Sequence, residues 1–359
     1  MDNTNTLVIS LVRKAVNPDY LIDKAVLAAA DWSEVIAVCA DQGVLGLCFE
    51  AIETLEEHRP PRPVLMRWIG ELVNLENTYR IHGLALEHLA ELYREEDIKL
   101  LLLKGYGLSL YWPKPNHRPC GDVDSYNFGK HVLADTIISQ KYGIKPDNSH
   151  HKHSVFTFEG VMVENHYEFL NTVAHRSTAE IEGILEKEIQ SGCSEDKQIK
   201  NLYYPSAKFN SLYLLRHSAE HFASVEISLR QVLDWGFFVQ SNNVDWEWLL
   251  KQLDVVGMKT YLAVLNTICI NYLGFNSTLF PELDVDKKLV ERCLHDIIHP
   301  EVKKERYRNP VKELLFRLRR WNSNRWKHDI VYKESAWQSF LTQALSHLLL
   351  KLGHYNPIL

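Results

Sequence analysis

Apolar residues recur every three or four positions along most of the chain, which is the period of an α-helix. From about Tyr20 to Glu96 this period runs through VIAVCADQGVLGLCFEAIETL and VLMRWIGELVNLENTYRIHGLALEHLAELYREE. Prolines at positions 60, 61 and 63 separate the two stretches. The helical period returns by Thr178 and dominates from Ser206 onward. The pattern therefore predicts helices on both sides of a central region.

The central region, residues 97–170, has the pattern of strands. The run IKLLLL is continuously apolar and ends at a Lys-Gly pair, which predicts a short buried strand that meets a turn. The next segment, YGLSLYW, predicts one or two helical turns, and GDVDSYNF predicts a second strand. Residues 129–140 return to helical spacing. The runs SVFTFE and VMVENHYEF predict a hairpin that turns at Glu159-Gly160.

These elements define the expected fold class, an α+β protein with a small mixed β-sheet. We predict an N-terminal helical segment at residues 1–96, a core at 97–200 and a mostly α-helical C-terminal domain at 201–359. The polar stretch SGCSEDKQIKN, residues 191–201, is expected to interrupt the helices.

Composition narrows the class of protein without indicating chemistry. The 359 residues are 46% hydrophobic and 24% charged, as in ordinary globular proteins. A net charge of -6 argues against a surface that is basic overall and built to hold nucleic acid. The six cysteines include no C-x-x-C pair, no apolar run reaches membrane-spanning length, and the first residues lack the features of a signal peptide. We therefore expect a cytoplasmic protein without a membrane span.

Three acidic residues of the expected sheet are candidates for metal binding. Side chains alternate across a strand, so Asp122 and Asp124 project from one face. By the same parity Glu164 and His166 share a face of the later strand. Carboxylates so close repel each other unless a cation lies between them, and Mg²⁺ or Mn²⁺ prefers such oxygen ligands. A two-metal site of this kind could hold a nucleoside triphosphate, with Glu164 positioning or deprotonating the acceptor.

The Lys104-Gly105 turn is a candidate for phosphate binding. Glycine allows close approach of the backbone, and the start of the following helix offers free N–H groups. Either Lys104 or Arg118 could add a positive charge.

The order of these elements resembles a known family. The run LLLKGYGLSLYWPKPNHRPCGDVDSYNF resembles the signature of the uncharacterised nucleotidyltransferase family of the polymerase β superfamily, in which L-K-G, a Y-P-like element, an Arg and G-D-[IV]-D follow in that order. The segment VMVENHYEF is similar to the family's V-D-[LV]-H-W element, with a Glu in place of the Asp. The matching positions are Lys104, Gly105, Tyr111, Pro113, Arg118, Gly121, Asp122, Asp124, Glu164 and His166.

The resemblance implies a Mg²⁺- or Mn²⁺-dependent nucleotidyltransferase core. It assigns catalysis and metal binding to Asp122, Asp124 and Glu164. Nucleotide binding falls to Lys104, Gly105, Arg118 and His166. The expected donor is a nucleoside triphosphate, with ATP favoured, and the acceptor is open among a small molecule, a sugar, a protein and an RNA end.

A later segment resembles the helical block of the same family. In SLYLLRHSAEHF and LRQVLDWGFFVQSNNVDWEWLL the paired histidines fall at His217 and His221, followed by Arg230 and Asp234. We expect the histidines to pack between helices or line the nucleotide cleft. Arg230 and Asp234, four residues apart, are expected to pair on one helix.

The sequence leaves two alternatives to nucleotidyl transfer open. Ser125, Tyr126 and Asn127 replace apolar residues after the second aspartate, and Lys104-Gly105 replaces the Gly-Ser of the wider superfamily, so the chain could be an inactive nucleotide-binding module. The segment from 217 to 221 also matches H-x-x-E-H, a zinc-hydrolase signature.

Two further segments have open roles. The cluster at residues 150–153, HHKH, is expected in a solvated loop, with binding of a transition metal or phosphate as the alternative. Residues 303–327 mix basic residues with Trp321 and Trp326. They predict an amphipathic helix with a basic outer face, against a surface for nucleic acid or an anionic membrane.

Overall fold

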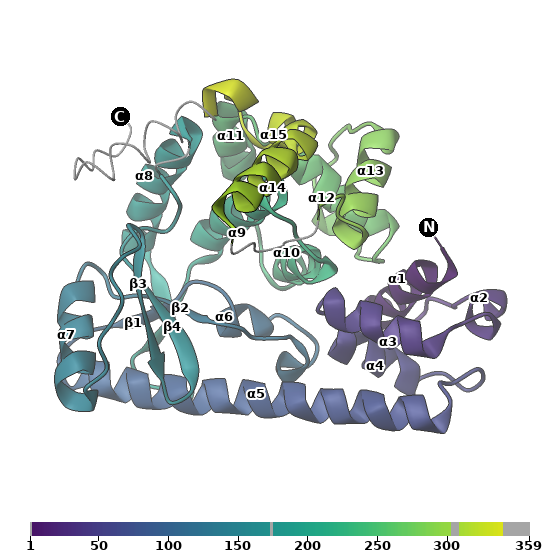
Figure 1. The fold of residues 1–359 in the computed structure, drawn as a ribbon, viewed down its shortest axis with the longest axis horizontal. Helices are drawn as coiled ribbons and strands as arrows, with labels where there is room; N and C mark the ends of the chain where they lie inside the picture. The colour runs from purple at the N-terminus through teal and green to yellow at the C-terminus, as the bar shows by residue number, and fades with distance from the viewer. Residues whose placement is uncertain (1, 173–174, 303–308, 340–359) are drawn as a thin grey trace.

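The protein consists of a mixed sheet at one end of the molecule and of helices that precede and follow it in the chain, as the pattern predicted (Figure 1). The structure is a computed structural model and describes residues 2–172, 175–302 and 309–339. The expected α+β class is confirmed.

The sheet has six strands in the order β3-β4-β2-β1-β6-β5. Their bounds are β1 Leu100–Leu102, β2 Val123–Tyr126, β3 His153–Phe158, β4 Val161–His166, β5 Cys193–Glu195 and β6 Leu202–Pro205. The predicted hairpin is present as β3 and β4. Its turn residues Glu159 and Gly160 both have positive φ angles, 49° and 83°, as a two-residue hairpin turn requires.

The sheet extends beyond its predicted limit at residue 170. The polar stretch 191–201 contains β5, which pairs with β6, and β6 pairs in parallel with β1 through Leu100 and Leu202. The Asn201 amide donates hydrogen bonds to the carbonyls of Ala90 and Ile98, which attaches this segment beside β1. The prediction of a simple helix interruption was incomplete, because strands of three or four residues with polar side chains lack a clear alternation.

Helices lie before, within and after the sheet. The first five are α1 Asn3–Val16, α2 Lys24–Ala28, α3 Trp32–Asp41, α4 Leu45–Glu53 and α5 Arg62–Arg94. Within the sheet region are α6 Tyr106–Ser109, the 3₁₀ turn η1 Pro115–His117, and α7 His131–Tyr142. The others are α8 Arg176–Ser191, α9 Ala207–Ser224, α10 Leu229–Ser241, α11 Trp246–Val256, α12 Lys259–Asn271, η2 Ser277–Leu279, α13 Lys287–Ile298, α14 Pro310–Ser323 and α15 Arg325–Val331. No helix among the described residues is long and apolar enough to cross a membrane.

The long helix α5 underlies the whole molecule (Figure 1). Its first half packs against α3 and α4, and its second half packs beneath the sheet. Proline is common at the start of helices, and the predicted division between two helices at the prolines is confirmed by the end of α4 at Glu53 and the start of α5 at Arg62.

The two faces of the sheet have different environments. Leu100, Leu102, Val123 and Val163 point into a hydrophobic cluster with α5 and α7. Because successive side chains alternate, their neighbours Asp124 and Glu164 point to the opposite face. The acids of the sheet thus lie on the face opposite to α5 and α7.

The segment 303–327 is described only from residue 309. There it forms α14 and the start of α15, so the helix expected in this segment is present. Its outer face is not only basic, since Val311, Leu314 and Leu315 are all more than half exposed. Residues 303–308 lie outside the described part of the chain.

Candidate functional site

The structure brings Asp122, Asp124 and Glu164 together. Strands β2 and β4 pair in parallel, and Asp124 lies directly opposite Glu164 in their register. One carboxylate oxygen from each of the three residues lies within 4.8 Å of the others. We call these three residues the acidic triad. Their spacing suits divalent cations, which take oxygen ligands from more than one carboxylate.

Asp124 is the most buried member of the triad, with 1% of its surface exposed. Its Oδ1 lies 2.7 Å from Lys104 Nζ and 3.0 Å from His166 Nε2. Its Oδ2 is buried without a hydrogen-bond partner. A buried carboxylate oxygen with no partner is costly, so the free oxygen fits a bound cation.

The charged groups of the site shift one another's pKa values. Burial opposes ionisation of Asp124, but the positive charge of Lys104 and the contact with His166 outweigh it and lower the pKa of Asp124. Burial and the neighbouring Asp124 raise the pKa of Asp122. Burial would lower the pKa of Lys104, but Asp124 and Asp122 raise it above its ordinary value. Lys104 is thus a cation built into the site.

Gly105 has a backbone conformation that other residues rarely adopt. Its φ angle is 63°, and a Cβ atom there would lie 3.2 Å from the carbonyl oxygen of Asp122. The turn therefore needs glycine both for its dihedral angle and for close packing beside the triad.

Arg118 contacts α10 rather than the triad. Its Nε and Nη2 donate to the two carboxylate oxygens of Asp234 at 2.7 and 2.8 Å, and its Nη1 donates to the carbonyl of Pro119. Trp112 Nε1 also donates to Asp234, at 2.9 Å. Direct contact between Arg118 and nucleotide stays a prediction.

The expected ion pair between Arg230 and Asp234 is replaced by the pair between Arg118 and Asp234. Arg230 instead donates to the carbonyl of Pro119 at 3.2 Å. Asp234 pairs with Arg118 because the buried guanidinium of Arg118 reaches it in bidentate geometry.

The prediction of a solvated loop for the segment 150–153 is right only in part: residues 150–152 form a bend in which His150 is exposed, whereas Lys152 and His153 are half-buried beside the site. The backbone carbonyl of Lys152 accepts hydrogen bonds from the amides of Tyr167 and Glu168, just after β4. Burial and the nearby Lys104 lower the pKa of Lys152. His153 begins β3, and its Nδ1 lies 3.5 Å from Glu164 Oε2. The histidine-rich composition was the only sequence signal for this placement.

Helix α9 covers the same face of the sheet. Burial lowers the pKa of His217 well below its ordinary value, and so do the charges of Lys104 and His221. Burial, with Asp124 among the nearby carboxylates, raises the pKa of Tyr213. The His217 ring contacts the rings of Tyr213 and His221 on the same helix, and the expectation that the histidines pack between helices or line the cleft stays a prediction.

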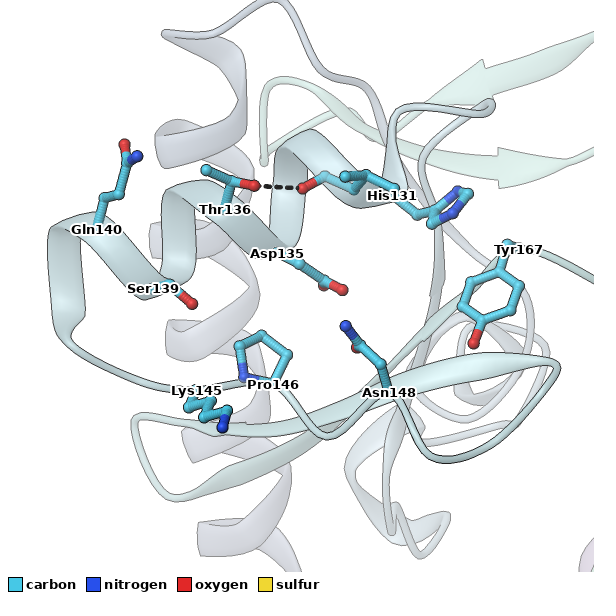
Figure 2. Close-up of a pocket in the computed structure, with 10 residues that line it drawn as sticks. His131, Asp135, Thr136, Ser139, Gln140, Lys145, Pro146, Asn148 and Tyr167 are labelled. Carbon is cyan, nitrogen blue, oxygen red and sulfur yellow. Dashed lines mark hydrogen bonds between the residues drawn. The ribbon is translucent and has the colours of Figure 1, made fainter. Parts of the chain in front are cut away.

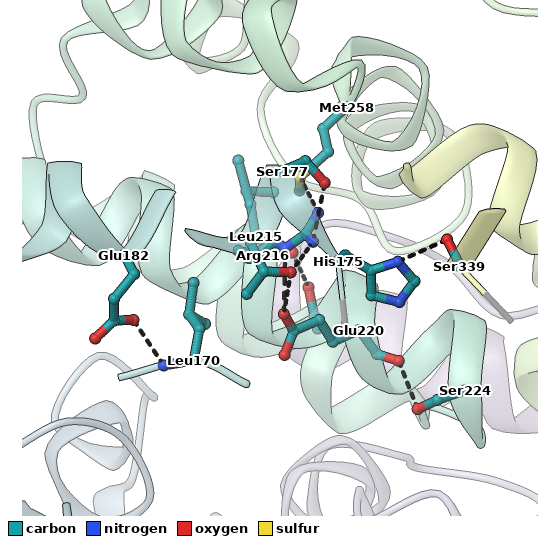
Figure 3. Close-up of polar contacts among 12 residues, drawn as sticks. Leu170, His175, Ser177, Glu182, Leu215, Arg216, Glu220, Ser224, Met258 and Ser339 are labelled. Carbon is teal, nitrogen blue, oxygen red and sulfur yellow. Dashed lines mark hydrogen bonds and ion pairs between the residues drawn. The ribbon is translucent and has the colours of Figure 1, made fainter. Parts of the chain in front are cut away.

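The H-x-x-E-H segment shows no support as a zinc site. Its Glu220 pairs with Arg216 at 3.2 Å and accepts a hydrogen bond from Thr178 (Figure 3). In the described part of the chain, neither His217 nor His221 belongs to a group of three potential metal ligands. Arg216 is fully buried in a polar network that reaches Ser177 and the sulfur of Met258.

A separate pocket opens between α7 and the loop before β3 (Figure 2). Its volume is about 520 Å³, and its floor includes Asp135, which accepts hydrogen bonds from Ser154 and Asn165. Asn165 follows Glu164 along β4 and therefore points to the opposite face of the sheet. The pocket is thus distinct from the acidic triad.

A sheet with one acid on a strand, a second just before that strand and a third on its parallel neighbour, beside a Lys-Gly turn, is consistent with a nucleotidyltransferase-type α+β protein. The family described as uncharacterised nucleotidyltransferase matches residues 28–274, more than half of the chain. The chain belongs to this family. Neither the curated proteins nor the solved structures include a significant match.

Proposed function

We propose that this chain transfers a nucleoside monophosphate from a nucleoside triphosphate, ATP being the expected donor, to a hydroxyl of an acceptor not yet identified. The observation that carries the proposal is the acidic triad, in which Oδ2 of Asp124 is buried without a hydrogen-bond partner. Membership of a nucleotidyltransferase family supports the same class of reaction.

The triad fits Mg²⁺ or Mn²⁺. Asp122, Asp124 and Glu164 would hold the ions, which would supply charge neutralisation at the phosphates and lower the pKa of the acceptor hydroxyl. The free Oδ2 of Asp124 supports this assignment, because a cation there removes the cost of the unpaired oxygen.

In the proposed reaction the acceptor oxygen forms a bond to the α-phosphorus. The bond from the α-phosphorus to the oxygen that bridges it to the β-phosphate breaks, and pyrophosphate leaves. Glu164, half-buried at the rim of the triad, positions the acceptor hydroxyl and takes its proton.

The remaining residues bind and orient the nucleotide. Lys104 supplies a positive charge to the phosphates, and Gly105 lets the backbone approach them. His166 bridges Asp124 and Glu164 and keeps both carboxylates oriented. Arg118 contributes from behind the site, since its bond to Asp234 anchors the segment that leads into Asp122.

The test measures pyrophosphate release from each nucleoside triphosphate with candidate acceptors, with and without Mg²⁺ or Mn²⁺. We expect release with the wild-type protein and none with Asp122→Ala. The matched control is Glu159→Gln, an exposed acid at the turn between β3 and β4, which should retain activity. Equal release by wild type and Asp122→Ala would refute the proposal.

A second candidate is a nucleotide-binding module without catalysis. The observation that favours it is the ammonium group of Lys104, which already neutralises Asp124 at 2.7 Å. Calorimetry separates the two functions: a module binds nucleotide equally with and without Mg²⁺, whereas the transferase needs the ion. The polar residues after Asp124 do not favour either function, because Ser125 and Asn127 are buried and donate to backbone carbonyls of the sheet region.

A further inference from the structure

His166 presents an unusual arrangement of hydrogen bonds. Its Nδ1 lies 3.1 Å from the backbone carbonyl oxygen of Glu168. Because a carbonyl oxygen only accepts hydrogen bonds, the proton of a neutral His166 ring belongs on Nδ1. The lone pair of Nε2 then faces Asp124 Oδ1 at 3.0 Å and Glu164 Oε2 at 3.3 Å. Three acceptor atoms cannot face one another without a proton or a metal ion between them.

His153 completes a group of three ligands around the same space. It lies directly opposite His166 in the antiparallel register of β3 and β4, so the two side chains share a face. Its Nδ1 is buried without a hydrogen-bond partner and lies 3.5 Å from Glu164 Oε2. Potential ligand atoms of His153, Glu164 and His166 all lie within 4.8 Å of one another.

We propose that His153, Glu164 and His166 form a binding site for a transition-metal ion, with Zn²⁺ as the preferred ion. Two imidazoles and one carboxylate form a ligand set typical of zinc and other late first-row metals, whereas Mg²⁺ prefers oxygen ligands alone. Glu164 is shared with the oxygen site of the triad. The proposal does not rest on the transfer reaction, because it concerns metal binding by His153, Glu164 and His166, which is measured separately from transfer.

The surroundings of the site favour a bound cation. The carbonyl of Glu168 fixes the ring of His166 with Nε2 toward the site, as hydrogen-bond partners behind zinc-binding histidines commonly do. The His150 ring stacks on His153 at a centroid distance of 4.3 Å and covers it. Three carboxylates in the triad exceed the two ammonium groups of Lys104 and Lys152 that act on them.

The proposed arrangement places two kinds of metal ion in one cleft. The ion on His153 and His166 would stay bound in the absence of nucleotide, because nitrogen ligands bind late transition metals strongly. Mg²⁺ at Asp122 and Asp124 would depend more on the phosphates of the nucleotide, since Mg²⁺ usually shares its ligands with the substrate.

The experiment uses the full chain stripped of metal and titrated with Co²⁺ as a visible probe for zinc. We expect one Co²⁺ per chain with the visible absorption typical of imidazole ligands, displaced by Zn²⁺. His153→Asn should weaken this binding by about 10–100-fold or more. Asp122→Asn should retain the absorption band, because Asp122 is not a ligand of the proposed site.

Two control variants make the test decisive. His88→Asn removes an exposed histidine of α5 and should bind Co²⁺ as wild type does. His217→Asn should also retain binding. Loss of the band in His217→Asn but not in His153→Asn would overturn the proposal in favour of the H-x-x-E-H segment. Unchanged affinity in a folded His153→Asn protein, checked by circular dichroism, would overturn it as well. Pyrophosphate release is measured separately, so failure of transfer does not decide the zinc site.

Discussion

The buried pair between Arg118 and Asp234 provides the sharpest prediction about stability. Arg118 is 4% exposed and Asp234 is 6% exposed, and two N–H···O bonds of 2.7 and 2.8 Å join them. The change Asp234→Asn keeps an acceptor oxygen for Trp112 but removes the negative charge. The guanidinium of Arg118 would then be buried without a counter-ion.

The expected loss follows from that geometry. Burial alone would lower the pKa of Arg118, and Asp234 raises it above its ordinary value. The guanidinium stays charged when Asp234 is removed, because the ordinary pKa of arginine lies far above neutral pH. Breaking a buried ion pair in this way costs about 3–5 kcal/mol. Natural domains have about 5–15 kcal/mol of total stability, so the loss is a large part of the whole. We also expect slower pyrophosphate release, because the pair anchors the segment that leads into Asp122.

Urea denaturation followed by circular dichroism measures the free energy of unfolding. The matched control is Glu57→Gln, which breaks the exposed pair with Lys24 and should leave stability unchanged. The double variant Arg118→Met with Asp234→Leu should lose less than the sum of the single variants, because no charge is left buried alone. A loss below about 1 kcal/mol in Asp234→Asn would refute the reasoning, since that is the range of exposed pairs.

Three further predictions concern individual residues. Glu164→Gln should lower the rate of pyrophosphate release by about 10²–10⁴-fold, the range for loss of a general base, and an unchanged rate would remove Glu164 from catalysis. Gly105→Ala should destabilise the protein by about 1–3 kcal/mol, because φ at this turn is 63°; denaturation measures this, and an unaffected midpoint would contradict it. Burial lowers the pKa of His175, which stacks on Tyr332, to about 2. The unfolded chain therefore binds the proton first, so the free energy of unfolding should fall as pH drops below about 6.5; His175→Phe should weaken this dependence, measured as melting temperature against pH, and an identical profile would count against it.

Much of the fold followed from local pattern. Apolar residues at helical spacing predicted the long helices, and the change to a continuous apolar run located β1. Alternation along a strand placed Asp122 and Asp124 on one face. These predictions were possible because the face on which a side chain lies within one element depends on the backbone period alone.

The polar contacts of the site were less accessible from sequence. Asp234 pairs with Arg118 and not with Arg230 four residues away, because burial and bidentate geometry decide the partner. Lys152 and His153 lie at the site although their composition is typical of an exposed loop. Both results depend on which segments pack on each other across long distances in the chain.

The sequence by itself determined the class of elements, the common face of the two aspartates and the resemblance to a nucleotidyltransferase family. Only the tertiary structure decided that β4 pairs in parallel with β2, which sets Glu164 opposite Asp124, and that β3 begins as early as His153, which then pairs with His166. The physical reason is that the pairing of β2 with β4 joins residues far apart in the chain. That pairing depends on the burial of whole faces, which no local pattern contains.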